Sequence, residues 1–135
     1  AMKRAVNLPF TLEFLGLEAE RIPLEDHAAD TVLVTYTLCS IPQVLQALSG
    51  MRRVLKPGGK LIFCEHGEAP DANVAGWQRF LQPMWGCIGG GCHLGRPIPK
   101  LIQEGGFKID NLETMYLPNT PRFAGYNYWG TAQAA

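Results

Sequence analysis

Hydrophobic side chains change their spacing along the chain, and each spacing predicts a different kind of element. Residues 31–38, TVLVTYTL, form a nearly continuous apolar and β-branched run, which is typical of a strand covered on both faces. Residues 60–67, KLIFCEHG, form a second such run. Between them, residues 41–55 have apolar side chains on one helical stripe, the pattern of an amphipathic helix, which ends at KPGG. The order strand, helix, strand predicts a βαβ crossover and therefore a parallel sheet.

The flanking segments predict further elements of both kinds. Residues 11–17 alternate and predict a strand, and residues 20–30 predict a polar, turn-rich connection. Residues 74–85 have apolar side chains at helical spacing, with a break expected at Pro83. Residues 96–107 have a proline at their second position and the glycines Gly105 and Gly106 near their end, which predicts a short helix.

The C-terminal region predicts two strands, residues 107–117 and 125–132, joined by a loop that contains proline. We expect this pair to form an antiparallel hairpin. The chain as a whole, residues 1–135, therefore predicts a single α/β domain whose mostly parallel sheet has an antiparallel edge.

Composition narrows the possible partners and the compartment. Twelve basic and twelve acidic residues cancel, so no broad positive surface suggests nucleic acid as a partner. No apolar run reaches the roughly 18 residues needed to span a bilayer, and no secretory signal is recognised. The four cysteines are too few for a disulfide-stapled scaffold, so we expect free thiols in the cytoplasm.

A glycine-rich stretch, GCIGGGCHLGR at residues 86–96, contains candidate chemistry. Cys87, Cys92 and His93 have a spacing that is not a usual zinc pattern, and no second pair completes four ligands, so we predict no metal site. A phosphate loop would follow a strand, whereas this stretch follows a predicted helix. Two interpretations remain open: a flexible segment beside an apolar pocket, or a tight turn that packs the cysteines as small hydrophobic side chains.

Three pieces in order resemble class I S-adenosylmethionine-dependent methyltransferases: LEAERIPLEDHAADTVLVTYTLCSI, MRRVLKPGGKLIFCEHG and EGGFKIDNLE…YNYWGTA. The resemblance is to the quinone-biosynthesis-like group, and WQRFLQPMWGCIGGGCHLGR is similar to its small-thiol and lipophilic-substrate members. It implies a partial Rossmann-like fold, S-adenosylmethionine as cofactor, and methyl transfer to a small, apolar acceptor such as a thiol, a quinone-like or a lipid-like molecule.

The chain departs from this family at its N-terminal end. The family's first two strands and its G-x-G-x-G turn, which cradles the methionine end of the cofactor, have no counterpart here, so the chain resembles an N-terminally truncated member. Without those strands, the strand at 31–38 would become an open edge. We expect a homodimer through this edge. The alternative to an enzyme is a truncated relic that serves as a dimeric binding or interaction module.

The resemblance also implies site residues. Adenine would be held by the turn after the first strand, and the rest of the cofactor would lie beside the end of the next strand; these residues are Glu18, Ala19, Glu20, Thr35, Tyr36 and Leu38. His66 ends the strand at 60–67, on the ligand side of a parallel sheet, and is the candidate general base. Trp77, Trp85, Cys92 and His93 would line the acceptor side.

Overall fold

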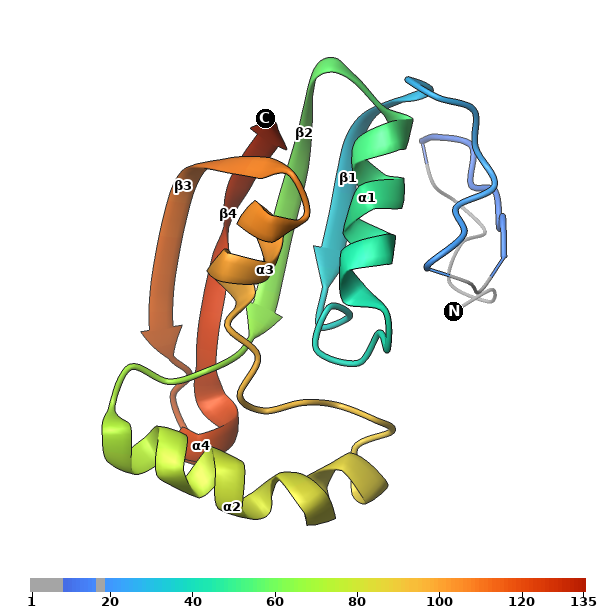
Figure 1. Cartoon of the computed structure of the whole chain (residues 1–135). Coiled ribbons are helices and arrows are strands. Elements are labelled where there is room, and N and C mark those ends of the chain that lie inside the picture. The colour runs from blue at the N-terminus through green and yellow to red at the C-terminus, as the bar shows by residue number, and fades with distance from the viewer. Residues whose placement is uncertain (1–8, 17–18) are drawn as a thin grey trace.

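The computed structural model describes residues 9–16 and 19–135 (Figure 1). Its strands are β1 (Ala29–Thr35), β2 (Leu55–His66), β3 (Phe107–Tyr116) and β4 (Tyr126–Ala134). Its helices are α1 (Val44–Val54), α2 (Ala72–Ile88), α3 (Ile98–Glu104) and α4 (Arg122–Gly125). The strands form one sheet in the order β1-β2-β4-β3.

The predicted βαβ unit is present. β1 and β2 are parallel neighbours, in register from Thr31 opposite Lys60 to Thr35 opposite Cys64, and α1 connects them. The apolar stripe of α1 faces the sheet, since Ala47, Leu48 and Met51 are buried. Periodicity alone therefore identified the crossover correctly.

The C-terminal hairpin is also confirmed. β3 and β4 are antiparallel, and β4 lies between β3 and β2, to which it is also antiparallel. The connection from β3 to β4 contains the short helix α4 (Figure 1). The result is a mixed α/β sheet that is consistent with a partial Rossmann-like fold, as the sequence predicted. The described sheet is not mostly parallel as expected, because only β1 and β2 pair in parallel, whereas β4 is antiparallel to both of its neighbours.

The core lies on one face of the sheet. α1 and α3 pack on that face in Figure 1, against buried side chains of the central strands. The members of this core include Leu38, Leu48, Leu61, Phe63, Ile98, Ile102 and Phe107. On the opposite face, Leu33 and its neighbour Ile62 are 65% and 39% exposed. The described residues thus leave one face of this sheet largely open to solvent.

The prediction of a strand at 11–17 is wrong for the part that the structure describes. Residues 9–16 contain no strand, and residues 17–18 lie outside the described residues. Phe10 and Phe14 are 61% and 63% exposed. Alternating side chains make a strand only where a neighbouring strand supplies hydrogen bonds, and no described strand pairs with this segment.

The expected break at Pro83 is also absent, because α2 continues to Ile88. Pro83 lies on the exposed side of α2, where water can bond the carbonyl that the proline leaves without an amide partner.

None of the described helices combines the length and the apolar character needed to cross a bilayer.

Candidate functional site

The carboxyl ends of β1 and β2 meet at a buried carboxylate. Glu65, the penultimate residue of β2, is fully buried. It accepts hydrogen bonds from the amide of Thr37, at 2.8 and 3.0 Å, and from the amide of Leu38, at 3.1 Å. Burial raises the pKa of Glu65, while these amides and the nearby Arg96 oppose that rise. Glu65 therefore fixes the turn after β1, which carries Cys39.

Tyr36 connects β1 to the hairpin. Its backbone is left-handed, with φ at 47°, which is uncommon for a residue other than glycine. The Tyr36 hydroxyl donates to Oδ1 of Asn127 at 2.7 Å, and the ring stacks on His66 with centroids 6.2 Å apart. A half-exposed aromatic ring is thus held at the end of the sheet where β1 and β2 terminate.

The glycine-rich stretch is held against α2 by Gln82. Its amide nitrogen donates to the carbonyl of Cys92 at 3.0 Å, and its oxygen accepts from the amide of Leu94 at 2.8 Å. The side chain thus satisfies both backbone groups as a neighbouring strand would. Cys92 and Leu94 are buried as a result.

The same stretch is also joined to the turn after β1. The amide of His93 donates to the carbonyl of Cys39 at 2.9 Å. Arg96 does not cap the helix that follows it; its guanidinium donates to the carbonyls of Leu38 and, at 2.8 Å, Ile41. These bonds bring Cys92 beside Cys39, although the two cysteines are far apart in the sequence.

Cys39, His66 and Cys92 form a cluster. One ligand atom from each lies within 4.8 Å of the others, and Nε2 of His66 is 3.0 Å from Sγ of Cys92. Both cysteines are buried and neither forms a disulfide. Burial lowers the pKa of His66, so its imidazole is neutral at pH 7, and burial raises the pKa of the Cys39 thiol to about 11.

This cluster differs from the set considered in the sequence. Cys87 is exposed on α2, and Nδ1 of His93 lies 3.1 Å from the carbonyl of Cys39 rather than facing a thiol. Within the described ranges, the one group of three potential metal ligands is Cys39, His66 and Cys92. Sequence spacing missed it because its members come from three separate segments: the turn after β1, the end of β2 and the stretch after α2.

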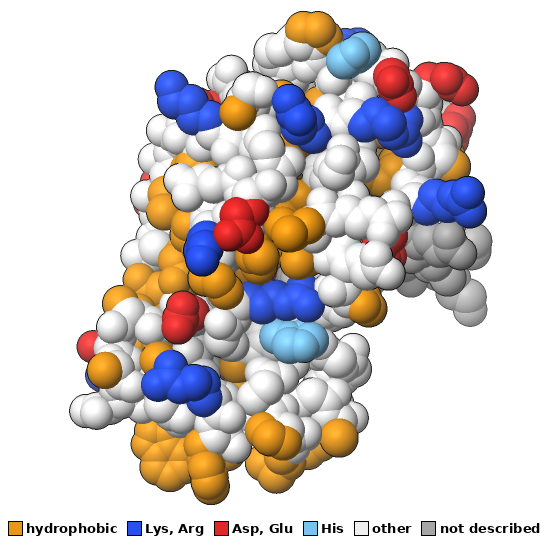
Figure 2. All heavy atoms as spheres, viewed as in Figure 1, with side chains coloured by type: hydrophobic (Ala, Val, Ile, Leu, Met, Phe, Trp, Pro, Cys, Tyr) orange, Lys and Arg blue, Asp and Glu red, His pale blue; other side chains and the backbone are white. Residues whose placement is uncertain are grey.

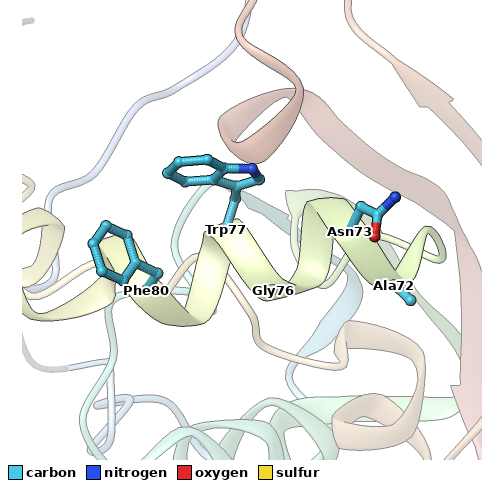
Figure 3. Close-up of a pocket in the computed structure, with 5 residues that line it drawn as sticks. All are labelled: Ala72, Asn73, Gly76, Trp77 and Phe80. Carbon is cyan, nitrogen blue, oxygen red and sulfur yellow. The ribbon is translucent and has the colours of Figure 1, made fainter.

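The aromatic residues of α2 face outward. Trp77 and Phe80 are 58% and 75% exposed and pack edge to face, with centroids 5.7 Å apart. With Ala72, Asn73 and Gly76 they line an open pocket of about 350 Å³ (Figure 3). In Figure 2 hydrophobic side chains gather at this end of the molecule.

Trp85 has a different environment from Trp77. Its ring packs edge to face against Phe123, with centroids 5.8 Å apart, and its indole N–H is buried without a partner. His93 lines another pocket, of about 200 Å³, with Gln82, Arg96 and others. The structure therefore does not bring Trp77, Trp85, Cys92 and His93 together around one pocket.

Only some of the residues predicted to hold the cofactor lie close together in the structure. Glu18 lies outside the described residues, and Ala19 and Glu20 are half-buried, with Ala19 packed against the core. Thr35 is exposed at the end of β1, next to Tyr36. The side chain of Leu38 is fully buried in the core, so only its backbone faces the end of the sheet.

The sequence of the chain is similar to the sequences of methyltransferases. A family model described as a methyltransferase domain matches residues 1–63. The chain is 41% identical over 108 residues to the thiol S-methyltransferase TMT1B of Rattus norvegicus, covering 76% of this chain and 44% of that protein. It is 39% identical over 57 residues to the ubiquinone/menaquinone biosynthesis C-methyltransferase UbiE of Brucella canis, covering 42% of this chain and 21% of that protein. The chain thus spans less than half the length of these relatives.

Solved structures agree at the level of the fold. A SAM-dependent methyltransferase from Methanosarcina mazei superposes with a TM-score of 0.66 at 18% identity, over 86% of this chain and 64% of that one. The predicted resemblance is therefore confirmed: the chain is similar in sequence to thiol and quinone-biosynthesis methyltransferases, and it has the fold of class I S-adenosylmethionine-dependent methyltransferases.

Proposed function

We propose that the chain forms the acceptor side of an S-adenosylmethionine-dependent methyltransferase whose acceptor is a small thiol. The observation that carries the proposal is the 41% identity with a thiol S-methyltransferase over 108 residues, a span that includes most of this chain. The position of His66 at the carboxyl end of β2 supports it, since ligands of such sheets bind at that end.

The residues at the end of β1 fit one part of the cofactor. Tyr36 offers a fixed, half-exposed ring, and Thr35 offers an exposed hydroxyl beside it; with Ala19 and Glu20 these would contact the adenosine. The 135 residues contain no counterpart of the G-x-G-x-G turn, which in the family would hold the methionine end of the cofactor. S-adenosylmethionine, when bound, would supply an electrophilic methyl group on its sulfonium sulfur.

The chain's own task is to prepare the acceptor. His66 has a neutral imidazole, and we assign it to take the thiol proton, which would leave a thiolate as the nucleophile. Trp77 and Phe80 on α2 provide apolar surface for the rest of an acceptor.

Calorimetric titration of S-adenosylhomocysteine into the 135-residue chain tests the proposal, with light scattering on the same sample. We expect binding near the micromolar range. No binding up to millimolar concentration would contradict methyl transfer by this chain.

A second candidate function is a non-catalytic binding module that uses the open apolar pocket on α2, which Trp77 and Phe80 line. The same titration separates the two, because a binding module has no need of S-adenosylhomocysteine.

A further inference from the structure

The cluster of Cys39, His66 and Cys92 has the composition of a transition-metal site. Two thiols and one imidazole are the ligands that Zn²⁺ prefers, and three protein ligands leave one coordination position open, as in catalytic zinc sites. The arrangement is built from three places: the turn after β1, the last residue of β2, and the stretch after α2. Residues that are neighbours in the sequence lie close together in any conformation, whereas these three side chains meet only in the folded chain.

The distances suit a tetrahedral ion. With Zn–S bonds of about 2.3 Å and Zn–N bonds of about 2.0 Å, ligand atoms around Zn²⁺ lie about 3.5–3.8 Å apart. The three atoms here lie within 4.8 Å of one another, and the nearest pair, on His66 and Cys92, is 3.0 Å apart. Shifts of less than an ångström would place them around an ion, which is within the range of side-chain adjustment.

Surrounding groups hold the ligands in place. Glu65 fixes the turn that carries Cys39, and Gln82 fixes the carbonyl of Cys92 and the amide of Leu94. Tyr36 stacks on the ring of His66. Metal sites depend on such supporting contacts for the orientation of their ligands.

The charges balance when a divalent ion is present. Two thiolates neutralise a divalent ion, and the imidazole of His66 binds it as a neutral ligand. Binding of an ion releases the thiol protons, so metal affinity should increase with pH.

We propose that Cys39, His66 and Cys92 bind Zn²⁺, with a fourth position open to an external ligand. If the chain methylates thiols as proposed above, that ligand is the acceptor: its S–H proton is released to solvent, a Zn–S bond forms, and no oxidation or reduction occurs. His66 then acts as a metal ligand rather than as a base, and the metal lowers the pKa of the acceptor thiol. The metal site itself does not depend on the proposed function.

Titration of the reduced, metal-free chain with Co²⁺ tests the site, since cobalt in a tetrahedral thiolate site gives intense visible and charge-transfer absorption. We expect one Co²⁺ per chain and displacement by Zn²⁺. Cys92→Ser should weaken binding by about 100-fold or more, whereas the matched variant Cys87→Ser should bind as the parent does. Absence of the thiolate band, or equal loss in both variants, would overturn the proposal.

A second measurement needs no variant and so does not depend on whether Cys92→Ser folds. Mass spectrometry of the intact parent chain under native conditions, after desalting, should show an increase by one Zn²⁺ less two protons, because both thiols ionise when they bind the ion. A mass that Zn²⁺ leaves unchanged would contradict the site. Both measurements omit the cofactor, and the S-adenosylhomocysteine titration is done in chelator, so each proposal fails on its own result.

Discussion

His66 is the residue on which both proposals depend. It lies at the end of β2, its Nε2 is 3.0 Å from Sγ of Cys92, and Tyr36 stacks on its ring. Desolvation keeps the imidazole neutral at pH 7, and a neutral ring can either accept a proton or bind a metal. In either role the lone pair of one ring nitrogen is what matters.

Replacing His66 should therefore affect methyl transfer more than folding. His66→Gln keeps a polar side chain of similar reach but removes the basic nitrogen, and we expect kcat/KM for a small thiol to fall by about 100-fold or more. The measurement is formation of the methyl thioether by the folded variant, checked by circular dichroism.

The matched control for this experiment is His27→Asn. His27 lies away from the cluster, has a left-handed backbone that asparagine tolerates, and bonds the carbonyl of Leu55. Its variant should keep the parent rate. A normal rate in His66→Gln would remove His66 from the mechanism.

At this scale the sequence named His66 and Cys92 as site residues but not Cys39. The position of His66 followed from the end of an apolar run, because strand ends bind ligands in parallel sheets. Cys39 carried no such signal, since a cysteine in an apolar region usually packs as a small hydrophobic side chain. Its proximity to Cys92 depends on bonds such as that of Arg96 to Ile41, which no local pattern encodes.

Gln78 joins helix α2 to several other segments of the molecule. This side chain is 1% exposed. Its oxygen accepts from the amide of Ala69 at 3.0 Å, and its nitrogen lies 2.9–3.2 Å from the carbonyls of Gly67, Leu94 and Phe123. One buried amide thus connects α2 to the segments on three sides of it.

Gln78→Leu should be strongly destabilising. The substitution leaves buried backbone groups without partners, each worth about 1–3 kcal/mol, so we expect a loss of about 2–4 kcal/mol in the free energy of unfolding. Urea denaturation followed by circular dichroism measures it. Gln46→Leu on the exposed side of α1 is the control and should change the free energy by less than about 0.5 kcal/mol. Similar losses in both variants would show that the bonds of Gln78 do not stabilise the fold.

The elements that the sequence predicted well are those whose burial sets their pattern. The run at 31–38 and the stripe at 41–55 gave β1 and α1 with small errors at the ends. The prediction of a strand at 11–17 failed because alternating side chains define the two faces of a strand but do not provide the neighbouring strand with which it must pair. Pro83 failed as a break because the exposed side of α2 lets water compensate for the missing hydrogen bond.

At the scale of the whole molecule, the described sheet ends in β1. Among the described strands, β1 lies at one end of the order and pairs only with β2. The side chain of Leu33 on β1 is 65% exposed on the open face of the sheet. An exposed edge strand with apolar side chains favours pairing with another chain.

We therefore expect the chain to be a homodimer that pairs through β1. Leu33→Lys places a charge on this edge, and it should shift the dimer to monomer in size-exclusion chromatography with light scattering. Leu45→Lys on α1, where the leucine is 45% exposed, adds the same charge away from the edge and should leave the dimer intact. A monomeric parent chain, or equal dissociation of both variants, would contradict pairing through β1. If the dimer forms, the second copy covers backbone groups of β1 that the four-stranded sheet leaves free, and the carboxyl end of β1 beside Tyr36 comes to lie at the interface.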